Sequence, residues 1–118
     1  MKLSAPQAQR YARHILLDEV GKDGQLRLLG SSVRVVGAGA AAEEAVRYLV
    51  AAGVGSLVVA ESLLAEHRAR WADLNEEVEL RSEGEHAHMI DLGSSSSRLE
   101  GVRAALGLLV TVAVEGEI

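Results

Sequence analysis

The residues of this chain best suited to chemistry are two glycines at the end of an apolar run. Gly37 and Gly39 follow the β-branched run 33–36, Ala42 stands three residues further on, and helix-forming residues continue from there. Glycine at the first position allows a tight turn, and glycine at the second lets a phosphate approach the backbone. The small Ala42 lets a helix lie close to the strand, and the first N–H groups of that helix can hold an anion. The spacing predicts a strand, a turn and a helix that can bind a nucleotide.

Two glutamates directly after this turn work against a phosphate. Glu43 and Glu44 fall in the first turn of the predicted helix, where negative charge favours the helix dipole. At about 6 Å and an effective dielectric constant of about 20, each glutamate would repel a phosphate charge by on the order of 2–3 kcal/mol. The turn therefore has two interpretations, a nucleotide site or a purely structural turn.

A pair of histidines offers a second candidate site. His86 and His88 alternate in a polar segment, and Asp91 or Glu85 could complete a set of metal ligands with them. Metal sites need such clustered side chains on one face. Two histidines in a polar loop can equally be solvated residues that bind nothing.

The composition is that of one small globular domain. The chain has 118 residues, of which 48% are hydrophobic, and it contains no Phe. Its net charge of −5 argues against a surface for nucleic acid or anionic membranes. The absence of Cys excludes disulfides, a cysteine zinc site and a cysteine nucleophile. No run approaches the ~20 apolar residues of a membrane span and none resembles a signal peptide, so a cytoplasmic protein is expected.

Apolar periodicity predicts a single α/β domain, with a helical arm at 1–30 and a sheet domain at 31–118. Tyr11, Ile15 and Leu16 share one face of the first predicted helix. Alternation of strands and helices implies a Rossmann-like parallel sheet with right-handed crossovers and the strand order 3-2-1-4. The expected helices are 4–20, 25–29, 40–52, 63–73 and 98–106, with a turn at 21–24, and the expected strands are 33–37, 56–61, 77–82 and 108–114.

The run 10–17, Arg-Tyr-Ala-Arg-His-Ile-Leu-Leu, resembles the opening of the MoeB/ThiF/HesA proteins, which are relatives of the ubiquitin-activating enzymes. Val20-Gly21, Gly24-Gln25, the glycine turn and the run 48–57 continue the resemblance, so that it covers about residues 8–62. Members of this family use ATP and Mg²⁺ to adenylate the C-terminal glycine of a ubiquitin-like or sulfur-carrier protein. The resemblance therefore implies a Rossmann-like fold, an ATP site and a carrier-protein partner.

The resemblance also implies roles for individual residues. Gly37 and Gly39 match the first two glycines of the family's ATP turn, and Ala42 replaces the third. Glu61 stands where the family has an Asp within reach of the ribose. Arg13 matches an arginine that, in family dimers, reaches the phosphates of ATP bound to the partner. From the residue types alone, Arg13 is a solvated charge on an amphipathic helix.

Departures from the family pattern affect the expected chemistry. Leu63 replaces the family's next acidic residue, and Ala69 and Ala72 stand in place of the Asn and Arg of a Ser-Asn-Leu-x-Arg-Gln signature. The Asp that ends the family's fourth strand and helps to hold Mg²⁺ has no counterpart, because Val114 or Glu115 falls there. The chain thus resembles a truncated and degenerate member of the family.

Two classes of function follow. The first is a non-catalytic or partner-dependent protein that forms a homodimer, pairs with a complete homologue or binds a carrier protein. The second is a small enzyme or sensor that binds ATP or NAD through Gly37, Gly39 and Glu61. Apolar terminal strands favour a dimer, since burying ~600 Å² is worth ~15 kcal/mol before the costs of association. The family resemblance implies ATP with Mg²⁺ as the cofactor, and the net charge of −5 argues against a nucleic-acid or membrane partner.

Overall fold

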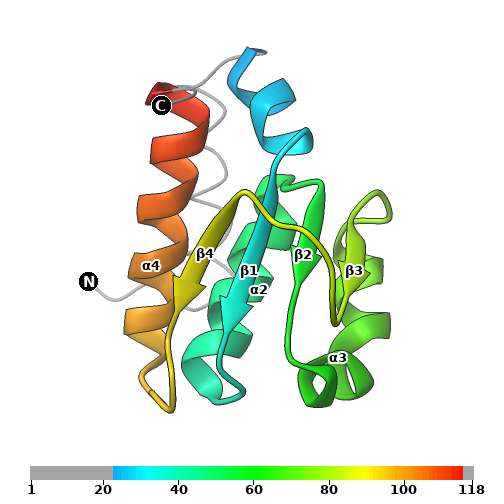
Figure 1. Cartoon of the computed structure of the whole chain (residues 1–118), viewed down its shortest axis with the longest axis vertical. Coiled ribbons are helices and arrows are strands. Elements are labelled where there is room, and N and C mark those ends of the chain that lie inside the picture. The colour runs from blue at the N-terminus through cyan, green and yellow to red at the C-terminus, as the bar shows by residue number, and fades with distance from the viewer. Residues whose placement is uncertain (1–22, 116–118) are drawn as a thin grey trace, which may run out of the picture.

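The computed structural model describes residues 23–115, and Figure 1 shows their arrangement. Residues 23–29 form a helical segment that leads into the first strand. The elements that follow are β1 (Ser32–Val36), α2 (Ala40–Ala52), β2 (Ser56–Val58), α3 (Glu61–Leu74), β3 (Glu79–Arg81), β4 (His88–Asp91), α4 (Arg98–Val110) and the π-helical turn η1 (Thr111–Glu115).

The four strands form one parallel sheet in the order β3-β2-β1-β4. Val33 of β1 is paired with Leu57 of β2, and Val35 is paired with Ile90 of β4. The predicted α/β class and the strand order are therefore confirmed. The fourth strand, however, is His88–Asp91 and not the predicted run 108–114.

Three helices lie on one face of this sheet. The steps from β1 to β2 and from β2 to β3 run in the same direction, so right-handed crossovers place α2 and α3 on the same face. Val33 and Val35 point to that face and are buried in one core with residues of α2, including Val46 and Leu49. Burial of these β-branched and aliphatic side chains is the main force that holds the layers together.

Helix α4 also lies in this helical layer, directly beside α2 (Figure 1). The run 108–114 was predicted as a strand because it is continuously apolar, but it continues α4 and then forms η1. Ala105, Leu109 and Val112 are buried, at spacings of four and three residues. That spacing aligns them along one side of a helix. A short apolar run does not by itself distinguish a strand from a buried helix, and here contact with α2 decides.

The opposite face of the sheet has no helix among the described residues. The loop 82–87 crosses it from the end of β3 to the start of β4, where the backbone N–H of Ala87 donates to the carbonyl oxygen of Ser32 at 3.1 Å (Figure 1). Arg34 and Met89 are register partners on this face, and both side chains are exposed. The fold is therefore a two-layer arrangement over the residues that the structure describes.

Several predicted boundaries shift in the structure. Strand β2 ends at Val58 instead of residue 61, because Glu61 already begins α3. Asp23 and Gly24 were predicted in a turn but are helical. The predicted helix 4–20 lies outside the described residues. None of the helices found between residues 23 and 115 is both long and apolar enough to cross a membrane.

Candidate functional site

The glycine turn has the predicted strand, turn and helix geometry. It connects the end of β1 to the start of α2, and Gly37 has a φ of 126°, which favours glycine. Gly39 is the N-cap of α2 with extended backbone angles, φ −89° and ψ −172°, so another residue could adopt its conformation. Ala42 is fully buried, and a Cβ added at Gly37 would lie 3.5 Å from its methyl group. The predicted role of Ala42 in close packing agrees with this contact.

The space beside both glycines is filled by the backbone that follows β4. A Cβ at Gly37 would lie 2.7 Å from the carbonyl oxygen of Gly93, and a Cβ at Gly39 would lie 2.7 Å from that of Ser95. The N–H of Ala41, in the first turn of α2, donates to the Ser95 oxygen at 3.4 Å. A helix N-terminus commonly offers such N–H groups to an anion. Here a carbonyl oxygen of the same chain accepts one of them.

The path of α4 explains this closure. In open parallel sheets a ligand crevice forms where the connections after two adjacent strands leave toward opposite faces. In this chain β1 and β4 are adjacent, and the helices that follow them, α2 and α4, both lie on the same face. A Cβ at Gly101 of α4 would lie 2.1 Å from the carbonyl oxygen of Ala41, so the two helices are in backbone contact at their first turns. No crevice opens between them, and the Gly93–Ser97 loop lies over the turn.

The glutamates after the turn are paired, which changes their predicted effect. Glu44 is 5% exposed, and its carboxylate forms ion pairs with Arg47 and with Arg98 of α4, the latter at 3.7 Å. Glu43 lies 3.9 Å from Arg98 and 3.7 Å from Nε2 of the buried His67. The predicted repulsion of a phosphate assumed free carboxylates. Both carboxylates instead lie beside side chains of neighbouring helices, Arg98 of α4 and His67 of α3.

Glu61 lies in a different groove from the glycine turn. It is exposed at the first position of α3, and it lines a groove with Arg68 of the same helix and Ser82 after β3. No residue of the glycine turn lines that groove. Among the described residues, Glu61 thus lines the groove beside α3, and Gly37 and Gly39 do not.

Asp91, which the sequence suggested only as a metal ligand beside the histidines, lies at the edge of the sheet where β1 also ends. It ends β4, beside Val36 of β1, so the fourth strand does end in an Asp, and the expectation of Val114 or Glu115 there was wrong. Its Oδ1 accepts a hydrogen bond from the N–H of Gly93 at 3.0 Å. The segment His88-Met-Ile-Asp91 has only two apolar residues, so its strand signal was weaker than that of the continuously apolar run 108–114.

The structure does not assemble the predicted metal ligands. Over residues 23–115 no group of three or more His, Asp or Glu side chains could hold a metal ion. His86 lines a shallow groove with Glu85 and Ser32, whereas His88 of β4 is the register partner of Val33 in β1.

Three residues that depart from the family pattern lie on α3. Leu63 is a core residue, and Ala69 and Ala72 line the groove on the outer side of α3. Arg13 lies outside the described residues.

Among residues 23–115, Tyr48 is the titratable group whose environment clearly changes its ionisation. Its side chain lies in the core cluster with α2 and α4, and the residue is 4% exposed. Burial raises the pKa of its phenol above 10.0, and the nearby Glu44 carboxylate raises that pKa further, with partial opposition from Arg47. Tyr48 is thus a neutral packing residue at physiological pH.

Comparison with known proteins places the chain beside a group of adenylyltransferases. Residues 11–61 match the ThiF family. The SAMP-activating enzyme E1 of Haloferax volcanii is 53% identical over 66 residues, which are 56% of this chain and 24% of that protein. The sulfur carrier protein ThiS adenylyltransferase of Escherichia coli is 50% identical over 52 residues, 44% of this chain and 21% of that protein. The sulfur carrier protein adenylyltransferase of Thermus thermophilus is 46% identical over 61 residues, 52% of this chain and 22% of that protein. The chain spans about a quarter or less of these relatives.

Proposed function

Because this chain is related to the ThiF family through residues 11–61, we propose that it acts by association and does not adenylate a carrier protein by itself. Its partner is a second copy, a complete ThiF-type homologue, or the ubiquitin-like or sulfur-carrier protein on which such a homologue acts. The location of this association is the cytoplasm. In that assembly the chain binds its partner through the part that matches the ThiF family, residues 11–61.

The observation that carries this proposal is the filled glycine turn. The carbonyl oxygens of Gly93 and Ser95 occupy the space in which Gly37 and Gly39 would otherwise admit a phosphate. A phosphate could enter only if the loop moved and the contact of Gly101 with Ala41 were relaxed. The residues present therefore do not fit ATP in the conformation described.

The charges near the turn support the same conclusion. Adenylation requires cations that neutralise phosphate charge in the transition state, and loss of one such group commonly costs ~3–4 kcal/mol. The nearest arginine from α4, Arg98, is already shared between Glu43 and Glu44. Asp91 is a single exposed carboxylate without further acidic neighbours that would complete a metal site among residues 23–115. Phosphate stabilisation would have to come from a partner.

A nucleotide-binding enzyme or sensor is the second candidate. The strand, turn and helix geometry around Gly37 favours it, as does the position of Asp91 beside the end of β1. In that function the Gly93–Ser97 loop would move on binding. The two candidates differ in whether the isolated chain binds a nucleotide.

Isothermal titration of the chain with ATP and Mg²⁺, with NAD in a parallel titration, separates these functions. We expect no saturable heat at millimolar concentrations of either ligand. Saturable binding of ATP would contradict the proposal and support the second candidate. ATP–pyrophosphate exchange in the presence of a sulfur-carrier protein should stay at the background rate of the carrier alone.

Light scattering at micromolar concentration tests association. We expect a dimer, because a ThiF-type protein that acts through its surface needs a partner. Only a 12.5 kDa species would contradict self-association. Sedimentation of the chain with a complete ThiF-type adenylyltransferase, and separately with its carrier protein, then tests the remaining partners, and no complex in either mixture would overturn the proposal.

A further inference from the structure

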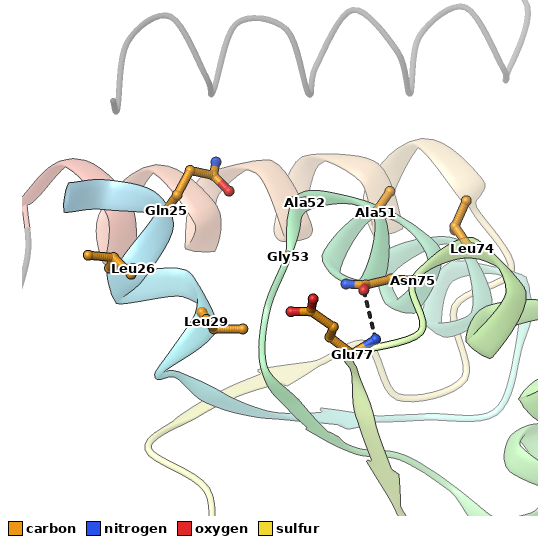
Figure 2. Close-up of a pocket in the computed structure, with 9 residues that line it drawn as sticks. All are labelled: Gln25, Leu26, Leu29, Ala51, Ala52, Gly53, Leu74, Asn75 and Glu77. Carbon is orange, nitrogen blue, oxygen red and sulfur yellow. Dashed lines mark hydrogen bonds between the residues drawn. The ribbon is translucent and has the colours of Figure 1, made fainter. Parts of the chain in front are cut away.

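A groove lined by three exposed leucines lies at the end of the domain away from the glycine turn (Figure 1), and Figure 2 shows the residues that line it. Its volume is about 340 Å³. Leu26 and Leu29 of the helical segment 23–29 form one wall, and Leu74 at the end of α3 lies opposite, with Ala51 and Ala52 of α2 between them. The groove is therefore built where the ends of three helical segments meet.

The leucines of this groove are unusually exposed. Leu26, Leu29 and Leu74 are 59%, 48% and 40% exposed, and they are three of the six large hydrophobic residues that are exposed in the described structure. Single exposed leucines are common on protein surfaces, but a cluster around one depression marks a contact site. Covering these side chains would remove apolar surface from water.

Three polar residues line the groove, Gln25, Asn75 and Glu77, and the side chain of Asn75 is hydrogen-bonded within the protein. Asn75 is the C-cap of α3, and its Nδ2 donates to the carbonyl oxygen of Val50 near the end of α2 at 3.1 Å. Its Oδ1 accepts from the N–H of Glu77 at 3.0 Å (Figure 2). A small-ligand pocket usually presents a few polar groups that converge on the ligand. Here the amide of Asn75 is used inside the protein, and the three exposed leucines favour an occupant that has an apolar face.

We propose that residues 4–20 of the same chain dock into this groove through the apolar face of Tyr11, Ile15 and Leu16. This segment lies outside the described residues, and its helical character is the expectation from its sequence. Only residues 21–22 separate it from the segment 23–29, which supplies Leu26 and Leu29. So short a connection gives the segment a high effective concentration at the groove.

The charges of the segment fit the same arrangement. In a helix with about 100° per residue, Arg13 would lie roughly 160° around the axis from both Tyr11 and Ile15, and Arg10 would lie roughly 100° from Tyr11. Docking of the apolar face leaves both guanidinium groups in water. The inference depends on the groove and on the sequence of the segment, and it is independent of the proposed function.

Engineered disulfides test the proposal cleanly, because the chain contains no Cys. The full chain carrying Ile15→Cys and Leu74→Cys is oxidised at low micromolar concentration and its disulfides are assigned by non-reducing electrophoresis and mass spectrometry. We expect an intrachain disulfide in most molecules. Two matched pairs serve as controls: Arg13→Cys with Leu74→Cys, and Ile15→Cys with Leu99→Cys, since Leu99 is as exposed as Leu26 but lies on α4.

Each outcome of this experiment either supports or overturns docking of residues 4–20 in the groove. Preferential intrachain linkage of Ile15→Cys to Leu74→Cys supports docking. Equal linkage in the control pairs, or no linkage, overturns it. Interchain linkage at Leu74→Cys overturns docking within one chain and assigns the groove to a second copy.

Proteolysis gives a second measurement that requires no cross-link. Leu74→Asp places a charge in the groove, and we expect trypsin to cleave after Arg10 and Arg13 several-fold faster than in the unmodified chain. Leu99→Asp is the matched control and should leave the cleavage rate unchanged. Circular dichroism verifies that both variants are folded. Equal rates in the folded Leu74→Asp variant and the unmodified chain would overturn the proposal.

Discussion

Gly101 and Ala41 bring the backbones of α4 and α2 into direct contact, because no side chain stands between the Gly101 α-carbon and the Ala41 carbonyl oxygen. This contact fixes α4 beside α2 at the end of the sheet where the strands terminate. Ser97 caps α4 by accepting a hydrogen bond from the N–H of Glu100 at 3.2 Å. The loop between β4 and this cap is consequently held over the glycine turn.

Substitution of Gly101 tests that contact. Gly101→Ala would place a Cβ 2.1 Å from backbone, so the helices must separate, and we expect the free energy of unfolding to fall by about 2–4 kcal/mol. Gly107→Ala is the matched control in the same helix, where an added Cβ meets nothing within 4 Å. That control should gain up to about 1 kcal/mol from helix propensity. Urea denaturation followed by the fluorescence of Trp71, the only tryptophan, measures both; equal effects of the two variants would refute the contact.

Gly39→Ala distinguishes a glycine needed for the chain's own loop from one needed for a ligand. The backbone angles at Gly39 suit alanine, so the cost arises from the Ser95 carbonyl 2.7 Å from the added Cβ. We expect a loss of about 1–3 kcal/mol in ligand-free protein. Gly30→Ala, whose Cβ meets backbone at an ordinary 3.5 Å, is the control. Unchanged ligand-free stability in Gly39→Ala would mean that the loop is readily displaced.

The ion pairs around Glu44 should differ in their contributions to stability. Arg98 has a side chain that is 55% exposed, so Arg98→Ala should cost less than about 1 kcal/mol and less still at high salt. Glu44 has a side chain that is 7% exposed and two arginine partners, so Glu44→Ala should cost more. A double-mutant cycle on Arg98 and Glu44, from denaturation at low and high salt, gives the coupling. A coupling energy of zero at low salt would show that the pair does not hold α4.

Alkaline pH should destabilise the protein through Tyr48. Its pKa is raised in the folded state, chiefly by burial and then by Glu44, so its contribution to stability is complete below the unfolded value near 10 and is lost as the pH rises through the folded pKa. Tyr48→Phe should reduce this loss. The absorbance of tyrosinate, recorded in a Tyr11→Phe background because the chain has only two tyrosines, gives the folded pKa. Titration of Tyr48 at the ordinary value would contradict the burial described here.

The local geometry of the glycine turn could be predicted from sequence. The β-branched run 33–36 and the glycines that follow it predict a strand and a tight turn through short-range sterics alone, and β1 and α2 form as expected. The order of the parallel strands could also be predicted from sequence, because right-handed crossovers leave few alternative orders. The pairing of Glu43 and Glu44 could not be predicted, since Arg98 and His67 come from other elements.

Local sequence specifies that β1, the glycine turn and α2 form one unit, since each depends on neighbouring residues. Whether that unit has space for a ligand depends on contacts between residues that are far apart in the chain. The apolar run 108–114 is compatible with either a strand or a buried helix, and packing of Ala105, Leu109 and Val112 in the core with α2 favours the helix. Helix α4 therefore lies on the same face of the sheet as α2. With both connections on one face no crevice opens, and the backbone of Gly93 and Ser95 closes the turn.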